Sequence, residues 1–401
     1  MRNSLLTLLA LFSLLLFACN KPAGNQDQKQ EQNQEQNENP NEGTDPNQGG
    51  NQNPADDEDL PPALVDGGVY LVTNELVEKF VTEVSYPEND YSETHILDEA
   101  YGPAAPGSAD KPQKFTIRWT ADPDAGAPVL RLWEGDWSRE YTSLTKDSYY
   151  QVVTNLRPNA EYHYEVKTAT KVLASATFTT TGHVHQLFFD KQVRNCRDLG
   201  GWKTKDGKTV KYRKVYRGGR MQDNTLNSKG RNDVLAEGIR AQLDLRGKSD
   251  VLSASPFEEF AFCAPVIEEG YSHLLQQDKA KAKQCFEFIA QCVSENKPVY
   301  FHCSLGRDRT GTVAMMVLGI LGVDEGDISK EYELTQYAPH GWATSDGEKS
   351  KMTRKVDYKS AAQYIWSLAN GGSFQDGMKN YLISIGVDEK VIADFQKNML
   401  E

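Results

Sequence analysis

A strand, a short loop and an apolar helix follow one another in residues 299–322, and this succession constrains the fold more than any other part of the chain. Residues 299–302 (VYFH) are strong β-formers, and residues 313–322 (VAMMVLGILG) are apolar on every side, as a buried helix is. A strand that leads through a loop into a buried helix is the building unit of helix-covered parallel sheets. Ligands of such sheets bind at the carboxyl ends of the strands, where this loop lies.

The same alternation of strands and helices continues through residues 183–401. Residues 239–245 read as a strand, and residues 279–296 repeat apolar side chains at helical spacing, which places Cys285 and Cys292 in the core. We therefore predict an α/β domain over residues 183–401, with a mostly parallel central sheet flanked by helices.

Residues 63–182 have a different pattern, in which polar and apolar residues alternate. The predicted strands are residues 114–119, 129–133, 149–153, 161–166 and 173–178, with two further candidates at 69–72 and 76–84. Seven short strands separated by turn residues indicate an antiparallel sandwich. Residues 156–162 (LRPNAEY) resemble the fibronectin type III signature, in which a tyrosine hydroxyl bonds back to the chain. We expect an all-β fibronectin III or immunoglobulin-like sandwich that serves as a spacer or binds an unidentified surface ligand.

The amino terminus indicates export. Residues 1–18 combine a positive Arg2 with an apolar stretch that is too short to span a bilayer comfortably, which is typical of a signal peptide. The ending Leu-Phe-Ala-Cys resembles a bacterial lipobox, which implies that Cys19 carries the lipid. The sequence thus predicts an exported protein that is anchored by its amino-terminal lipid to a bacterial membrane, facing the periplasm or the surface.

Residues 19–62 form a candidate tether. They are dominated by Asn, Gln, Glu, Asp, Gly and Pro, and residues 20–60 hold ten acidic residues against two lysines. A segment with so little apolar surface has no core to form, so we expect it to be disordered.

The loop after residue 302 groups the residue types that phosphate chemistry requires. A loop that curls into a helix start directs N–H groups at an anion, and Gly306 permits the backbone turn this needs. Arg309 can grip two oxygens of a phosphate, and the same positive field favours the thiolate of Cys303. A thiolate beneath a bound phosphoryl group is placed for in-line attack.

The order His302-Cys303-x-x-Gly306-x-x-Arg309-Thr310-Gly311 resembles the signature loop of the cysteine-dependent protein tyrosine phosphatases. Similar motifs of a bacterial branch of that superfamily, the atypical tyrosine and dual-specificity phosphatases, follow in the same order: residues 195–201 (NCRDLGG), 215–220 (VYRGGR), 243–246 (LDLR) and 328–335 (ISKEYELT). Two residues depart from the branch: Cys196 occupies a commonly aromatic position, and Arg307 replaces the usual lysine.

The resemblance implies hydrolysis of phosphate monoesters in two steps, with no metal or other cofactor. Cys303 takes the phosphoryl group, Arg309 and the loop amides bind its oxygens, Thr310 assists departure of the sulfur, and His302 orients the loop. The phosphate-binding residues implied in this way are Ser304, Leu305, Gly306, Arg307, Asp308 and Arg309.

A general acid must protonate the leaving oxygen, and three aspartates are candidates. The family assigns this role to the aspartate inside the loop, here Asp308. Asp198 lies in a Gly-Gly turn motif and Asp244 lies beside Arg246 at a strand end, so these residues are possible supports that fix arginines by ion pairs.

The substrate stays open at this stage. A phosphorylated protein, a phosphoinositide and an inositol phosphate all suit a loop of this design, and Arg307 favours a substrate with neighbouring phosphates unless it only supports the loop. An inositol-phosphate (phytase-like) phosphatase is therefore the enzymatic alternative. A surface-tethered protein that binds through its sandwich is the alternative of another class, and nothing in the sequence indicates a nucleic-acid partner.

Overall fold

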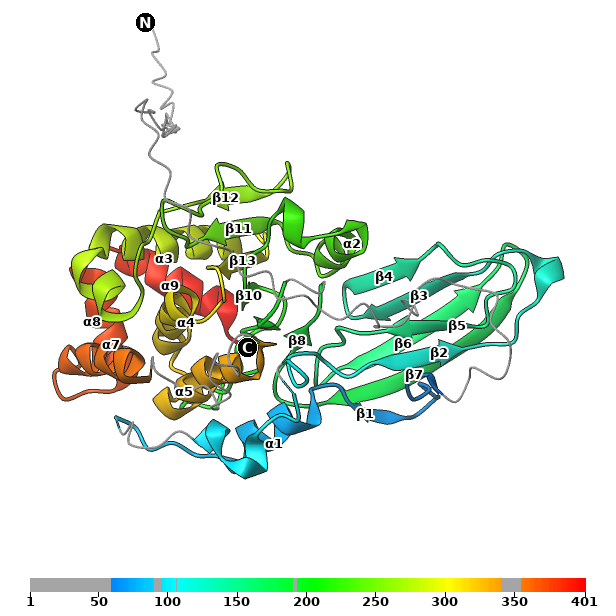
Figure 1. Ribbon diagram of the computed structural model, residues 1–401, viewed down its shortest axis with the longest axis horizontal. Coiled ribbons are helices and arrows are strands. Elements are labelled where there is room, and N and C mark those ends of the chain that lie inside the picture. Colours follow the sequence, from blue (N-terminus) through cyan, green and yellow to red (C-terminus); the bar gives the residue numbers. More distant parts are fainter. Residues whose placement is uncertain (1–58, 90–94, 106, 190–192, 340–354) are drawn as a thin grey trace, which may run out of the picture. The chain divides into compact units, whose positions relative to one another are not determined.

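The computed structural model describes residues 59–89, 95–105, 107–189, 193–339 and 355–401. The predicted signal peptide, Cys19 and the tether up to residue 58 lie outside the described residues. The described residues belong to one compact unit, and Figure 1 shows their helices and strands. Within the described residues, no helix is long and apolar enough to cross a membrane.

Seven strands precede the α/β part of the chain. They are β1 (Val69–Leu71), β2 (Phe115–Arg118), β3 (Val129–Glu134), β4 (Trp137–Tyr141), β5 (Tyr150–Val153), β6 (Glu161–Lys167) and β7 (Val172–Thr181). Five of them form a sheet in the order β1-β7-β6-β3-β4, and β2 pairs with β5. Alternate residues of both sheets are buried in one shared core, including Ile117 of β2, Leu132 of β3 and Tyr162 of β6. The period-two pattern of the sequence is therefore the pattern of these inward-facing side chains.

The predicted tyrosine contact at the start of β6 is present. The Tyr162 hydroxyl accepts a hydrogen bond from the Arg157 backbone N–H at 3.0 Å, and its ring is fully buried. The Arg213 side chain, which belongs to the α/β part, donates to the same hydroxyl at 3.0 Å.

The prediction of a strand at residues 76–84 is wrong, because this segment forms helix α1 (Glu75–Glu83). Val77, Phe80 and Val81 are its buried residues, which is the spacing of one helix face. The Asn74 side chain caps the helix by accepting from the Leu76 N–H at 3.0 Å. The seventh strand is instead β4, which was not predicted because Ser138, Arg139 and Glu140 separate its two apolar residues, Trp137 and Tyr141.

Helix α1 packs in the core of the α/β part, together with residues that follow it, such as Tyr86 and Ala109. The Lys330 ammonium donates to the Val81 and Val84 carbonyls at 3.0 and 3.1 Å, at the carboxyl end of α1. The sandwich therefore does not fill residues 63–182 without interruption as expected, since part of this range completes the neighbouring core.

A six-stranded mixed sheet organises the α/β part. Its strands are β8 (Gln186–Leu187), β9 (Cys196–Asp198), β10 (Val215–Gly218), β11 (Ala241–Asp244), β12 (Ala261–Cys263) and β13 (Val299–His302), in the order β12-β11-β13-β10-β9-β8. The first four in this order are parallel, whereas β9 and β8 are antiparallel to their neighbours. The fully buried β13 thus lies between two parallel strands, as its apolar sequence indicated.

Helices cover this sheet (Figure 1). They are α2 (Ser228–Ala236), α3 (Lys279–Ser294), α4 (Asp308–Leu321), α5 (Glu325–Glu333), α7 (Lys355–Ser367), α8 (Phe374–Ser384) and α9 (Glu389–Met399). Helix α3 packs on α9, and α4 packs on α5 and α8. Cys285 and Cys292 are buried in α3 as predicted, and α4 is buried almost throughout.

Candidate active site

The site forms where strand β13 ends and helix α4 begins. Residues 303–309, the phosphate loop, connect the two elements, and the Cys303 side chain is 2% exposed at the start of the loop. The amino terminus of a buried helix and the ends of three parallel strands therefore converge on this thiol.

Two glycines allow this loop to fold against its neighbours. Gly306 has a φ of +73°, and a Cβ there would lie 2.5 Å from the Gly218 carbonyl group at the end of β10. A Cβ at Gly311 would lie 2.7 Å from the Tyr332 ring. Both positions therefore require glycine, the first because of its backbone conformation and the second because of close packing.

The carbonyls of the phosphate loop are bound from behind by buried side chains. The Asn195 amide donates to the carbonyl of Leu305 at 3.2 Å and to that of Gly306 at 3.0 Å. The Arg217 guanidinium also donates to the Gly306 carbonyl, and the Arg220 N–H donates to the Ser304 carbonyl at 3.1 Å. A planar trans peptide directs its C=O and its N–H to opposite sides. The N–H groups of residues 306 and 307 share peptides with the bound carbonyls of residues 305 and 306. They therefore point away from Asn195 and Arg217, as an anion cradle requires.

A shared carboxylate holds the residues behind the loop. Glu331 of α5 accepts from the Arg197 Nε at 2.7 Å, and the Arg217 Nε lies 3.6 Å from the same oxygen. Arg197 and Arg217 also donate to the Asn195 side chain. Burial and the neighbouring Arg217 lower the pKa of Arg197 to about 10. Sequence reasoning quoted these motifs but assigned no role to Asn195, Arg217 or Glu331.

His302 is positioned as a structural link. Its Nε2 accepts from the Gln242 amide at 2.8 Å, and its Nδ1 donates to the Cys303 carbonyl at 3.1 Å. Burial lowers the pKa of His302 to about 4, so the imidazole is neutral at physiological pH. These contacts agree with the expected orienting role and do not require proton transfer.

Asp244 and Asp198 are both engaged in structural contacts. Asp244 accepts from the Arg246 Nε at 2.9 Å and Nη2 at 2.8 Å. Although burial alone would raise the pKa of Asp244, the hydrogen bonds from this guanidinium and from the Leu252 backbone N–H hold it below its usual value. Asp198 accepts hydrogen bonds from the backbone N–H groups of Gly200 at 2.8 Å and Arg213 at 2.6 Å. It accepts none from an arginine side chain in the described part of the chain. The expectation that Asp198 fixes an arginine side chain is therefore wrong, because it holds a backbone turn.

Arg309, Asp308 and Arg307 surround the first turn of α4. The Arg309 Nη1 donates to the Ile267 carbonyl at 2.9 Å, and the Arg307 Nε donates to the Asp308 Oδ1 at 3.0 Å. The contact of Arg307 with Asp308 favours the loop-supporting role that was left open for this arginine. Thr310 is fully buried, and its hydroxyl has no hydrogen-bond partner within the described part of the chain.

The second thiol of the family motifs is inert. Cys196 is 3% exposed, and burial raises its pKa to about 12. Its sulfur lies 3.3 Å from both the Arg194 carbonyl and the Tyr300 hydroxyl, behind strand β10. A protonated, buried thiol of this kind is neither a nucleophile nor a metal ligand.

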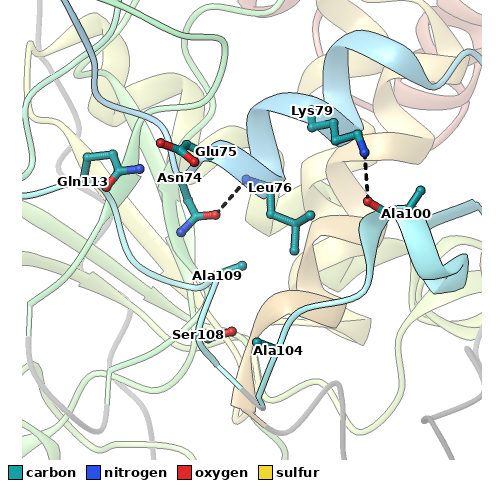
Figure 2. A pocket seen from close by; sticks show the side chains of 9 residues that line it. All are labelled: Asn74, Glu75, Leu76, Lys79, Ala100, Ala104, Ser108, Ala109 and Gln113. Carbon is teal, nitrogen blue, oxygen red and sulfur yellow. Dashed lines mark hydrogen bonds between the residues drawn. The ribbon is translucent and has the colours of Figure 1, made fainter.

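A cavity of about 570 Å³ opens beside the phosphate loop and is lined by Asp308 and Arg309. Its other walls come from residues 268–273 and from α7, and they carry Glu268, Glu269 and Asp357. A second pocket of about 430 Å³ lies between α1 and the segment that contains Ala100 and Gln113, and none of the predicted site residues lines it (Figure 2).

This geometry is that of a phosphate-handling α/β protein, with a braced loop at a strand end and a helix amino terminus behind it. A family model described as "Tyrosine phosphatase family" matches residues 190–401, more than half of the chain. The chain belongs to this family.

Two curated relatives agree with this placement. A predicted tyrosine-protein phosphatase of Cupriavidus necator is 28% identical over 176 residues, which cover 37% of this chain and 62% of the relative. A tyrosine-protein phosphatase of Nostoc commune is 31% identical over 139 residues, which cover 31% of this chain and 46% of the relative. The chain thus spans less than two thirds of either relative. A crystal structure of Tk-PTP in a mutant form is 16% identical in sequence to this chain. The match covers 36% of this chain and 89% of that chain, with a TM-score of 0.24.

A buried carboxyl beside the loop should make stability depend on pH. Asp110 accepts from the Asn195 N–H through both oxygens, at 3.2 and 3.0 Å. Burial raises its pKa from 3.8 to about 6 in the folded protein, against the opposing effect of that hydrogen bond and of nearby arginines. The folded state therefore binds a proton more tightly than the unfolded state, and this contribution to stability is lost as the pH rises from about 4 to about 6.

The wild type should lose about 3 kcal/mol of unfolding free energy from this group between about pH 3 and about pH 7, at about 1.4 kcal/mol per pKa unit. Asp110→Asn has no proton to lose there, so the variant should gain on the wild type as the pH rises. Urea unfolding at a series of pH values measures the difference. If the stabilities of the wild type and Asp110→Asn change with pH in parallel, the pKa of Asp110 is not raised in the folded protein.

Proposed function

We propose that the chain hydrolyses phosphate monoesters of the phosphotyrosine type through a covalent phosphoryl group on Cys303. The observation that supports this most directly is the bracing of the phosphate loop by Asn195 and Arg217, which turns loop N–H groups toward the position of an anion. A cradle that is held in place before the substrate arrives needs no reorganisation during the reaction.

In the first step the Cys303 thiolate attacks phosphorus while the bond from phosphorus to the leaving oxygen breaks. The Arg309 guanidinium binds two equatorial phosphoryl oxygens. Its hydrogen bond to the Ile267 carbonyl either breaks or is kept beside these new contacts. Asp308 gives its proton to the departing oxygen, so that a neutral alcohol or phenol leaves.

In the second step water attacks the phosphoryl group and its proton passes to Asp308. The sulfur–phosphorus bond breaks, inorganic phosphate leaves and the Cys303 thiolate is restored. The buried Thr310 hydroxyl, which is otherwise unpartnered among the described residues, is available to donate to this sulfur. His302 holds the Cys303 carbonyl and keeps the loop in register.

Cys303→Ser should abolish turnover, because an alcohol in this loop is not ionised at neutral pH. Binding of vanadate or phosphate should be largely retained, since the cradle consists of backbone N–H groups and Arg309. Hydrolysis of an aryl phosphate and vanadate binding by the purified variant give the two readouts. More than trace turnover in Cys303→Ser would refute the mechanism, and removal of divalent metals from the wild type serves as a control that should have no effect.

The walls of the cavity favour a substrate with a single phosphate on an uncharged carrier. Glu268, Glu269 and Asp357 line it with Asp308, whereas Arg307 is already paired with Asp308. Leu305 is 37% exposed in the phosphate loop and offers an apolar contact. Several carboxylates repel the additional phosphates of an inositol polyphosphate, and the apolar contact suits an aromatic ring. These observations favour phosphotyrosine over the inositol-phosphate alternative.

The value of kcat/KM should therefore be higher for a phosphotyrosine peptide than for phytate. Glu269→Gln should narrow this difference by a factor of about two to three, mainly through the KM for phytate, because an exposed charge acts through a screened field. Glu161→Gln, on strand β6 away from the cavity, is the matched control and should change kcat/KM for neither substrate. A wild-type preference for phytate would reverse the assignment.

We also propose that the protein is exported and anchored through a lipid on Cys19, and that the sandwich extends the enzyme from the membrane. The support for this is the sequence of residues 1–62. Identification of the first residue of the chain isolated from membranes tests it. The alternative of a binding protein that acts only through its sandwich is disfavoured by the complete phosphate loop.

A further inference from the structure

A chain of two hydroxyl groups ends on the Asp308 carboxylate. The Tyr271 hydroxyl donates to Asp308 Oδ1 at 2.5 Å, and the Tyr332 hydroxyl lies 2.6 Å from the Tyr271 hydroxyl. Since the Tyr271 proton is given to Asp308, Tyr332 is the donor in the second bond. Tyr271 is 6% exposed and Tyr332 is 1% exposed. Burial, Tyr332 and Asp308 all raise the pKa of Tyr271, so it remains a protonated donor.

The donors that reach Asp308 all use one of its two carboxylate oxygens. Tyr271 and the Arg307 Nε, at 3.0 Å, both bind Oδ1. Oδ2 has no hydrogen-bond partner within the part of the chain that the structure describes. The Asp308 side chain is 28% exposed and lines the 570 Å³ cavity, so a leaving group can reach it.

The segment that carries Tyr271 is built around the start of α4. Val266 and Tyr271 have φ values of 59° and 54°, which a β-branched or aromatic residue rarely adopts. A Cβ at Gly270 would lie 2.9 Å from the backbone between Asp308 and Arg309, and the Tyr271 N–H donates to the Thr312 hydroxyl at 2.7 Å. A strained backbone in close contact with a site is a mark of a segment that positions functional groups.

We propose that Tyr271, supported by Tyr332, is a positioning residue that fixes the Asp308 carboxyl so that Oδ2 carries the catalytic proton. This inference rests on the proposed function and assigns the proton to one atom. When the bond from phosphorus to the leaving oxygen breaks, the proton moves from Oδ2 to that oxygen and Asp308 becomes a carboxylate. The attacking water returns a proton to Oδ2 in the second step. Oδ1 keeps its contacts with Tyr271 and Arg307 throughout.

The test compares two leaving groups in Tyr271→Phe, which keeps the ring and removes only the hydroxyl. With phenyl phosphate, whose oxygen needs a proton, kcat/KM should fall about tenfold, a fraction of what general acid catalysis supplies. With 4-nitrophenyl phosphate, which leaves as a stable anion, kcat/KM should change less than about twofold. The comparison uses kcat/KM because this value reports the first step, whereas kcat also includes the second step, which both substrates share. Vanadate inhibition should stay unchanged, because the cradle does not include Tyr271.

Two further tyrosines make this comparison specific. Tyr332→Phe should show the same leaving-group dependence with a smaller loss, and it replaces the first variant if Tyr271→Phe fails to fold. Tyr381→Phe removes a buried hydroxyl that has no partner among the described residues, and it is the matched control that should leave both rates unchanged.

Asp308→Asn separates the inference from the function on which it rests. If Asp308→Asn lowers kcat/KM selectively for phenyl phosphate but the tyrosine variants lower kcat/KM equally for both substrates or for neither, the positioning role is refuted and the enzyme assignment stands. If Asp308→Asn lowers kcat/KM equally for both substrates, Asp308 is not the acid and the inference falls with it. Retained turnover in Cys303→Ser would refute the proposed function itself.

Discussion

Two buried arginines share the carboxylate of Glu331, and the geometry of the phosphate loop depends on this arrangement. Arg197 and Arg217 are 4% and 0% exposed, and Glu331 is 1% exposed. Arg197 and Arg217 place positive charge directly behind the loop, where water screens it little, and the carboxyl groups of Glu331 and Asp110 act on the same Arg197. Asn195 and Arg217 hold the carbonyls of the loop, and Arg197 holds Asn195. Removal of one partner from such a group costs about 3–5 kcal/mol, because a buried charge is left uncompensated.

Support for the loop extends toward the amino-terminal part of the chain. Glu331 lies on α5, and Lys330 of the same helix caps α1 through the Val81 and Val84 carbonyls. The Tyr86 hydroxyl donates to Glu333, and Asp110 holds the Asn195 backbone. The segment between β1 and β2 of the sandwich is thus part of the unit that supports the phosphate loop. A substitution there acts on the phosphate loop through α5 and Asn195 without touching the substrate.

The sequence allowed the strand, loop and helix of the site to be predicted because local rules determine them. A β-branched and aromatic run forms β13, an apolar run forms α4, and Gly306 adopts the conformation that only glycine adopts readily. The roles of Asn195, Arg217 and Glu331 were missed because each depends on residues that are 22 to 136 positions apart and meet only in the fold. Helix α1 was read as a strand because its buried face, Val77, Phe80 and Val81, belongs to a core formed mostly by residues more than 100 positions away. The hydroxyl chain from Tyr332 to Asp308 leaves no local pattern at all.

The central claim is that Cys303 carries the phosphoryl group during turnover. Rapid acid quenching of the wild type with an aryl phosphate, followed by mass spectrometry of its peptides, tests this directly. The account predicts one phosphoryl group on the peptide that contains Cys303 and none there in Cys303→Ser. Phosphate on another residue of a wild type that turns over the substrate would contradict the account. So would an Asp308→Asn variant without phosphate on any residue, because this variant slows the second step and should accumulate the phosphoryl group.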